Sequence, residues 1–330
     1  MAPRKLTKRQ KARIGRIQEQ RRQRMHKRAE STLVDNHEAS LTGRVIARHG
    51  QNLVVQGEDD KYTHCLFRQN LGEVVCGDRV VWQPTHDEEG VVTALLPRDS
   101  VLSRPDYSGR DKPLAANITQ LVVVLAPEPQ PTGYLTDQYL VAAERIGVSA
   151  IIALNKADLL TEEQWRAFHQ TFAHYEKIGY PVLRISAKQQ NGLAPLRKHL
   201  QHHTSILVGQ SGVGKSSLIN ALMPHKNLEE GRLSEASGLG RHTTSAATLY
   251  VLDSGGEIID SPGVRSFRLG KLSRQELERG FREFIPYLDQ CQFSNCAHRA
   301  EPGCALVEAV EKGEIDPDRL QNFRHMAQDT

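Results

Sequence analysis

The sequence lacks the features of a membrane or secreted protein. No run approaches the roughly 20 apolar residues that cross a bilayer, and no signal-peptide core follows the basic start. The five cysteines among 330 residues are too few for a disulfide framework. We therefore expect a soluble, cytoplasmic protein that makes no membrane contact and works as a monomer.

Acidic residues are scarce at the start of the chain. The net charge is only +4, yet the first 28 residues hold twelve lysines and arginines against one acid, Glu19. A block of like charges repels itself, so residues 1–35 are expected to form a disordered arm or an isolated helix until they meet a polyanion. Nucleic acid is the natural partner of such an arm, and a merely solubilising tail is the alternative.

The length exceeds what one compact core needs, so two or three domains are expected. Short β-like runs, separated by turns rich in Gly and Asp, follow the arm. They span 42–47, 52–56, 62–67, 78–82 and 90–95. Five strands at this spacing predict a small β-barrel over residues 36–100. An OB-fold fits the count and the size, and another small barrel is the alternative.

Residues 100–112 have the composition of a linker, and from 118 the texture becomes βα alternation. Apolar runs at 121–126, 150–154, 182–185 and 205–208 alternate with helical stretches at 134–146, 162–178, 192–202 and 215–223, and strands at 246–252 and 256–260 follow. Apolar runs separated by helices predict a mostly parallel α/β sheet that is covered on both faces. We assign residues 101–270 to this domain and 271–330 to a helical domain.

A phosphate-binding loop is the strongest motif. Gly209–Ser216 matches G-x-x-x-x-G-K-[ST] and lies between an apolar strand and a helix. Its backbone N–H groups would face phosphate oxygens, Lys215 would reach the β- and γ-phosphates, and Ser216 would bind Mg²⁺. The predicted nucleotide-binding residues here are Gly209, Gln210, Ser211, Gly212, Val213, Gly214, Lys215, Ser216 and Ser217.

A base-reading loop is predicted at the end of an earlier strand. Asn155, Lys156, Ala157 and Asp158 resemble the Asn-Lys-x-Asp motif of GTPases. A carboxylate can accept hydrogen bonds from both N1–H and N2 of guanine, and adenine has no donor there, so Asp158 argues against an ATPase. Ser186 and Ala187, after the next strand, resemble the Ser-Ala motif that meets guanine O6 through a backbone N–H.

Two further loops carry the candidate catalytic residues. Asp260-Ser-Pro-Gly263 fits Asp-x-x-Gly, in which Asp260 would hold Mg²⁺ through water and the Gly263 N–H would sense the γ-phosphate. The stretch 238–245 resembles a switch I loop, whose Mg²⁺-binding residue is either Thr243 or Thr244.

Many GTPases carry a glutamine after the Asp-x-x-Gly glycine to orient the attacking water, and Val264 stands at that place here. His242 is the candidate to position the water instead, because an imidazole can accept a proton near neutral pH. A solvated loop histidine is the alternative for His242. We expect slow intrinsic turnover that a partner raises by ordering the loop.

Four candidate metal ligands lie close together near the C-terminus. Cys291, Cys296, His298 and Cys304 offer three thiolates and one imidazole, a donor set that suits one structural Zn²⁺ with all four positions filled. Unliganded cysteines beside a surface histidine are the alternative.

The GTPase motifs run in a rotated order. Ordinary GTPases begin with the phosphate loop and end with Asn-Lys-x-Asp and Ser-Ala, whereas here those last two motifs come first. With the barrel before and the Cys/His cluster after, and with Gly-Leu-Gly-Arg-His-Thr-Thr at 238–244 and Asp-Ser-Pro-Gly-Val-Arg at 260–265, the chain resembles the family of circularly permuted, ribosome small subunit-dependent GTPases. The resemblance implies GTP/GDP and Mg²⁺ as ligands, 16S rRNA and the 30S subunit as partners, and a role in late 30S maturation.

Two functions of different class remain open. One is a GTP hydrolase that the ribosomal small subunit stimulates. The other is an RNA-binding module that keeps GTP as a structural or switching ligand with negligible hydrolysis, which Val264 leaves open.

Overall fold

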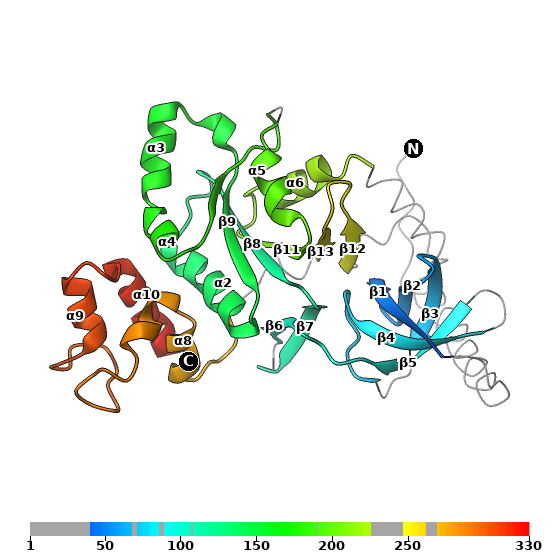
Figure 1. Ribbon diagram of the computed structural model, residues 1–330, viewed down its shortest axis with the longest axis horizontal. Coiled ribbons are helices and arrows are strands. Elements are labelled where there is room, and N and C mark those ends of the chain that lie inside the picture. Colours follow the sequence, from blue (N-terminus) through cyan, green and yellow to red (C-terminus); the bar gives the residue numbers. More distant parts are fainter. Residues whose placement is uncertain are drawn as a thin grey trace, which may run out of the picture.

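A computed structural model describes most of the chain (Figure 1). The described residues are 40–67, 71–85, 89–106, 108–189, 191–225, 247–261 and 269–329. The predicted arm at 1–35 lies outside these ranges, as do His242, Thr243, Thr244 and Gly263. Within these ranges, no helix combines the length and the apolar character that a membrane crossing requires.

Five strands close into the predicted barrel. They are β1 (Leu41–His49), β2 (Asn52–Gly57), β3 (Tyr62–Phe67), β4 (Arg79–Pro84) and β5 (Glu89–Leu95). The pairing order is β1-β2-β3-β5-β4, and β4 also pairs with β1, which closes the barrel in the manner of an OB-fold. Inward-facing residues such as Val45, Leu53 and Trp82 form a core of its own.

The central domain contains the predicted parallel sheet. Its strands are β8 (Gln120–Leu125), β9 (Ser149–Leu154), β10 (Val182–Arg184), β11 (Thr204–Val208), β12 (Ala247–Val251) and β13 (Glu257–Asp260). They lie in the order β10-β9-β8-β11-β13-β12, with all neighbours parallel except the β12–β13 pair. Every residue of β8 is buried, as a strand covered on both faces requires.

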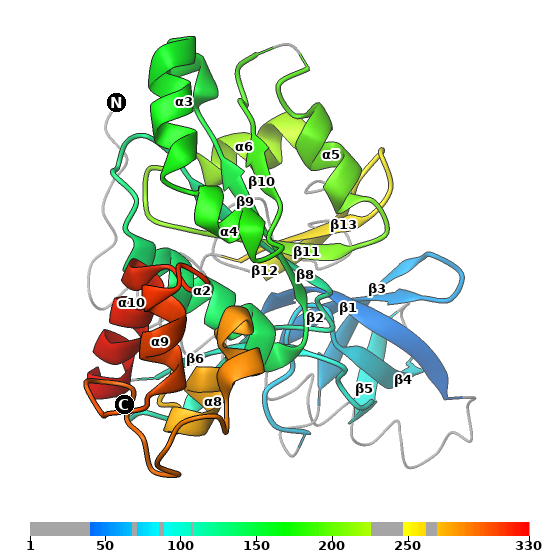
Figure 2. The same cartoon turned by 60° about the vertical axis from the view of Figure 1, so that its left-hand side comes forward.

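The helices cover both faces of this sheet. They are α2 (Gly133–Ile146), α3 (Glu162–Gln170), α4 (Ala173–Lys177), α5 (Ala194–Leu200) and α6 (Lys215–Leu222). The parallel crossovers through α2 and through α3 and α4 step one way across the sheet, and the one through α5 steps the other way. Since parallel crossovers are right-handed, α2, α3 and α4 cover one face and α5 the other; α6 lies beside α5, as Figure 2 shows.

The barrel and the central sheet form one hydrogen-bonded surface of eleven strands. β1 pairs with β12 at Ala47–Thr248 and Arg48–Ala247. The Arg44 guanidinium supports the joint, because its Nη1 lies 2.7 Å from both carboxylate oxygens of Glu257 on β13. The barrel is therefore fixed against the edge of the central sheet.

The prediction of a linker at 100–112 is wrong. This stretch belongs to a hairpin of β6 (Val101–Pro105) and β7 (Asp111–Ala116). At its turn, Asp106 Oδ1 accepts hydrogen bonds from the N–H groups of Ser108 and Arg110, at 2.7 and 3.0 Å. Pro, Asp, Ser and Gly are typical both of linkers and of such turns, so composition alone did not separate the two.

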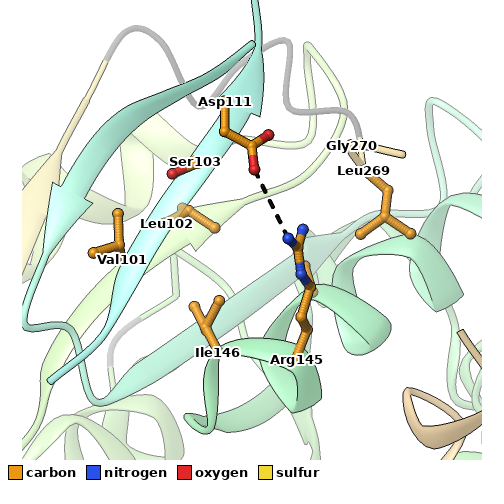
Figure 3. Close-up of a pocket in the computed structure, with 9 residues that line it drawn as sticks. Val101, Leu102, Ser103, Asp111, Arg145, Ile146, Leu269 and Gly270 are labelled. Carbon is orange, nitrogen blue, oxygen red and sulfur yellow. Dashed lines mark ion pairs between the residues drawn. The ribbon is translucent and has the colours of Figure 1, made fainter. Parts of the chain in front are cut away.

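A cavity of about 250 Å³ lies where this hairpin meets the last turn of α2 and Leu269–Gly270 (Figure 3). The carboxylate of Asp111 and the guanidinium of Arg145 face each other across it, 3.8 Å apart. Because α2 runs back along the sheet, the cavity lies at the opposite end of the helix from the loop that precedes α2.

The C-terminal part is helical, as predicted, and lies across the central sheet from the barrel (Figure 1). Its elements are α8 (Arg274–Arg279), η5 (Arg282–Tyr287), α9 (Ala305–Glu311) and α10 (Pro317–Asp329). In its core, Phe281 and Phe284 stack at a ring-centroid distance of 4.8 Å, and Phe323 meets both rings edge-on at 5.7 and 5.5 Å.

A buried charge cluster joins this part to α2. Arg319 of α10 is 1% exposed; its guanidinium binds both oxygens of Glu283 at 2.6 and 2.9 Å, and Asp137 of α2 at 2.6 Å. Asn322 and Tyr175 donate to Asp137 at 2.7 and 2.6 Å. Burial alone would lower the pKa of Arg319, but the two carboxylates outweigh burial and raise that pKa, so the charge is retained.

Replacing Arg319 should therefore be costly. Arg319→Ala leaves two carboxylates buried without their cation, and we expect it to lower the free energy of unfolding by about 3–5 kcal/mol. Urea unfolding followed by circular dichroism measures this. Arg166→Ala, at an exposed position of α3, is the control, and an equal effect of both substitutions would contradict the account.

Candidate nucleotide site and metal cluster

The predicted nucleotide loops all leave one edge of the sheet. β9, β8, β11 and β13 are parallel, with Leu125 paired to Leu154, Val123 to Val208 and Ile206 to Ile259. Ligands of open α/β sheets bind at the carboxyl ends of the strands. The loops after these four strands therefore face a common space.

The phosphate loop has the predicted strand–loop–helix form. It follows β11 and leads into α6 at Lys215. Gly209 has φ +140° and approaches the Val124 carbonyl so closely that no Cβ fits between them. Gly214 has φ +96°, and a Cβ there would lie 2.5 Å from Asn155 Nδ2. Both positions therefore require glycine.

The side chains of this loop divide into anchors and exposed groups. Val213 is fully buried, and Lys215 Nζ donates to the carbonyls of Gly209 and Gln210, both at 2.6 Å. The exposed members are Ser211, Gly212, Ser216 and Ser217. The two serines of the first turn of α6 stand where the unpaired N–H groups and the positive end of the helix dipole favour an anion.

Asn155 binds the base-reading loop to the phosphate loop. Its side chain is 2% exposed, and its Nδ2 donates to the Val213 carbonyl at 2.9 Å, across 58 residues of sequence. The buried Asn155 Oδ1 and Gln210 Oε1 have no hydrogen-bond partner among the described residues. Buried polar atoms without a partner at two adjoining loops fit a site that a polar ligand completes.

The Ser-Ala loop orients Asp158. Ser186 is 1% exposed and its hydroxyl donates to Asp158 Oδ1 at 2.6 Å. The Ala157 N–H donates to the Ile185 carbonyl at 3.2 Å, and half-buried Ala187 follows Ser186. A carboxylate has about four lone-pair sites, so Asp158 can accept the serine proton and still accept two donors from a base edge.

Lys156 adopts φ +61°, and its Nζ donates to the Glu128 carbonyl at 2.8 Å. Glu128 lies on the loop between β8 and α2, so this contact brings a third loop of the same edge against the base-reading loop. The long Lys156 stem is thereby held in an ordered position beside Asn155.

Asp260 is the last residue of β13, next to the strand that carries the phosphate loop. Since Ile259 pairs with Ile206, Asp260 lies level with Leu207, two residues before Gly209. The sheet register thus brings the described part of Asp-x-x-Gly to the phosphate loop.

One contributor to the site was absent from the sequence prediction. The Tyr139 hydroxyl of α2 hydrogen bonds with the Gly209 backbone, and burial raises the pKa of Tyr139 to about 12. Only the fold brings residue 139 to residue 209, so no local sequence signal indicates the contact.

The four predicted metal ligands converge. One ligand atom from each of Cys291, Cys296, His298 and Cys304 lies within 4.8 Å of the others. His298 Nδ1 lies 3.4 Å from Cys304 Sγ and 3.6 Å from Cys291 Sγ. Burial lowers the pKa of His298, which favours the neutral imidazole that metals bind.

Backbone N–H groups point at two of the sulfurs. The Ala305 N–H donates to Cys291 Sγ and the His298 N–H to Cys296 Sγ, both at 3.4 Å. Such donors stabilise thiolates. The S₃N donor set, its spacing and these contacts are all compatible with a zinc site.

The fold and the two joined loops define a P-loop GTPase whose base-reading loop precedes its phosphate loop in the chain. The chain belongs to the RsgA GTPase family, whose model matches residues 95–270. It is 46% identical to the Small ribosomal subunit biogenesis GTPase RsgA of Azotobacter vinelandii, over 99% of this chain and 97% of that protein. The relative of the same name from Pseudomonas aeruginosa is 45% identical over 99% and 97%.

Solved structures agree. YjeQ from Thermotoga maritima is similar with a TM-score of 0.72 and 32% identity, covering 88% of this chain and 98% of that one. YloQ, described as a circularly permuted GTPase, has a TM-score of 0.70 and 30% identity, covering 89% and 96%. The permuted order that the sequence indicates is therefore confirmed.

The close contact between Gly214 and Asn155 yields a prediction. In Gly214→Ala, the added methyl group would collide with the side chain that joins the two loops, so we expect GTP affinity to fall at least tenfold, about 1.4 kcal/mol. Titration with a fluorescent GTP analogue measures it.

Gly255→Ala is the matched control, because Gly255 also has positive φ (+84°), yet a methyl group added there would meet no atom within 4 Å. Unchanged affinity in Gly214→Ala, with the control also unchanged, would show that the contact does not matter for binding.

Proposed function

We propose that this GTPase acts in maturation of the small ribosomal subunit and that the subunit stimulates its GTP hydrolysis. The observation that carries the proposed nucleotide site is the Asn155–Val213 hydrogen bond, which joins the base-reading loop to the phosphate loop. The biological role is supported by relatives that match nearly the whole chain and are named small ribosomal subunit biogenesis GTPases.

The phosphate loop would hold the triphosphate. Lys215 leaves its two carbonyl partners for the β- and γ-phosphates, and the first N–H groups of α6 face phosphate oxygens. Ser216, either Thr243 or Thr244, and Asp260 through a water would hold Mg²⁺; hydroxyl and carboxylate oxygens are the hard donors that this ion prefers. When bound, Mg²⁺ neutralises charge on the β- and γ-phosphates.

The base-reading loop would select guanine. Asp158, oriented by Ser186, accepts from N1–H and N2 of the base, the Ala187 N–H meets O6, and Lys156 covers the ring. ATP offers no donor to Asp158, which is the basis for preferring GTP.

Hydrolysis requires an oriented water, and the side chain of Val264 has no polar atom that could hold one. We assign that role to His242, with the Gly263 N–H as the sensor of the γ-phosphate. The water oxygen attacks the γ-phosphorus and its proton passes to the His242 imidazole, while the bond from that phosphorus to the oxygen that bridges to the β-phosphate breaks and GDP leaves with this oxygen. Ordering of the loop by a bound subunit would then raise the rate.

The partner would be 16S rRNA within the 30S subunit, and the arm at 1–35 supplies the charge for an RNA contact. The protein would act as a monomer in the cytoplasm, where these subunits mature. We assign the cluster Cys291, Cys296, His298 and Cys304 to one structural Zn²⁺, which would hold the loop 291–304 in a fixed shape where the apolar core is small.

Stimulation of turnover tests the role. We expect purified small subunits to raise the GTP hydrolysis rate at least tenfold, which corresponds to about 1.4 kcal/mol of transition-state stabilisation, in a phosphate-release assay. Large subunits serve as the negative control. The proposal would be overturned if small and large subunits gave equal hydrolysis rates, or if neither kind raised the rate of the protein alone.

Base selection is tested separately through Asp158→Asn. An amide can donate to a xanthine oxygen but cannot accept from both guanine donors, so GTP affinity should fall at least tenfold while xanthosine triphosphate binds better. Asp253→Asn, at an exposed position outside the site, is the control. Retained guanine selectivity in Asp158→Asn would show that Asp158 does not select the base.

A further inference from the structure

His298 presents its two ring nitrogens to different partners. Nδ1 faces the thiols of Cys291 and Cys304, whereas Nε2 lies 3.3 Å from Glu278 Oε1. Both side chains are largely buried, at 6% exposure for His298 and 14% for Glu278. The Phe323 ring, at a centroid distance of 5.9 Å, packs beside the imidazole.

Glu278 comes from outside the cysteine-bearing segment. It belongs to α8, whereas the four candidate ligands lie between 291 and 304. The neighbouring acid Glu276 turns back to cap the helix at Ser273 and is exposed, so among the two acids of α8 it is Glu278 that reaches the cluster.

α8 is itself fixed at its other side. Leu277 is fully buried, and at Gly280, which ends the helix, a Cβ would lie 2.6 Å from Val141 Cγ1 of α2. The helix therefore lies between the metal cluster and α2, and the Glu278–His298 contact is its polar connection to the cluster.

We propose that Glu278 is the positioning residue of the metal site: it accepts the Nε2 proton of His298, which directs the Nδ1 lone pair at the metal and fastens α8 to the cluster. This inference rests on zinc occupancy of the cluster. A carboxylate on the outer nitrogen of a ligating histidine fixes the ring and its tautomer, and loss of such a partner costs roughly 10–100-fold in metal affinity in other proteins.

The location of α8 gives the contact a further consequence. α8 is the first described helix after Asp260, on the path from the Asp-x-x-Gly motif into the C-terminal part. A metal held through Glu278 thus stabilises the helix that receives the chain from the nucleotide edge of the sheet.

Zinc affinity tests the proposal in the full-length protein, by competition against a chromophoric chelator. We expect Glu278→Ala to bind zinc about 10–100-fold more weakly, and Glu278→Gln to stay close to wild type because its amide oxygen still accepts the Nε2 proton. Glu311→Ala, at an exposed position on α9, is the matched control.

The possible outcomes separate the two claims. Absence of zinc from the wild-type protein would refute the assignment of the cluster to zinc, and the role of Glu278 would fall with it. With zinc bound, equal affinity in Glu278→Ala and Glu311→Ala would overturn the positioning role. A loss in Glu278→Gln as large as in Glu278→Ala would also overturn it, because the effect would then come from charge.

A measurement without a variant covers the case in which Glu278→Ala does not fold. Long-range ¹H–¹⁵N spectra of the imidazole in the zinc-loaded wild-type protein should show Nε2 protonated and Nδ1 bound to metal. A metal-bound Nε2 would refute the proposed geometry.

Discussion

The candidate nucleotide site depends on one buried hydrogen bond, from Asn155 Nδ2 to the Val213 carbonyl. It joins the loop after β9 to the loop after β11, and Gly214 allows the approach because no Cβ stands between them. The bond does not depend on the order of the two strands in the chain, because the parallel sheet brings both loops to one edge whichever strand comes first. This is why a permuted chain retains the arrangement of an ordinary GTPase site.

Helix α2 connects that site to the rest of the molecule. Tyr139 hydrogen bonds with the Gly209 backbone at the start of the phosphate loop, and Asp137, two residues earlier, lies in the buried cluster with Arg319. Arg282 adds a second tie, since its guanidinium lies 2.5 Å from Glu144 and 4.2 Å from the Tyr180 ring centroid. The phosphate loop and the C-terminal part therefore rest on the same helix.

Local signals in the sequence predicted most of the fold and the loops that form the candidate site. Gly209 and Gly214 stand where the backbone needs positive φ, Lys215 follows them, and Cys291, Cys296, His298 and Cys304 lie close enough in the sequence to indicate that they meet. Contacts between distant segments were not predictable. The β1–β12 pairing depends on two strand edges that meet only in the folded protein. In the sequence, Arg319 is one of several charged residues of a polar helix, and Glu278 cannot be distinguished from its exposed neighbours. The wrong linker prediction has the same origin, because the hairpin forms only where Leu102 and Ala115 find a core to enter.

In the permuted order, the chain after Asp260 leads directly into the C-terminal part, so a change there would act on that part. Two typical free energies indicate how large such an effect can be. Coupling free energies between sites are typically about 1–3 kcal/mol, whereas removing one member of a buried ion cluster costs about 3–5 kcal/mol. Separating Arg319 from Asp137 and Glu283 without new partners for the three charges would therefore cost more than such a coupling supplies. In this structure the cluster docks the C-terminal part on α2, and the chain enters that part at α8. The same helix, α2, therefore carries the buried cluster that holds the C-terminal part and the tyrosine that contacts the phosphate loop.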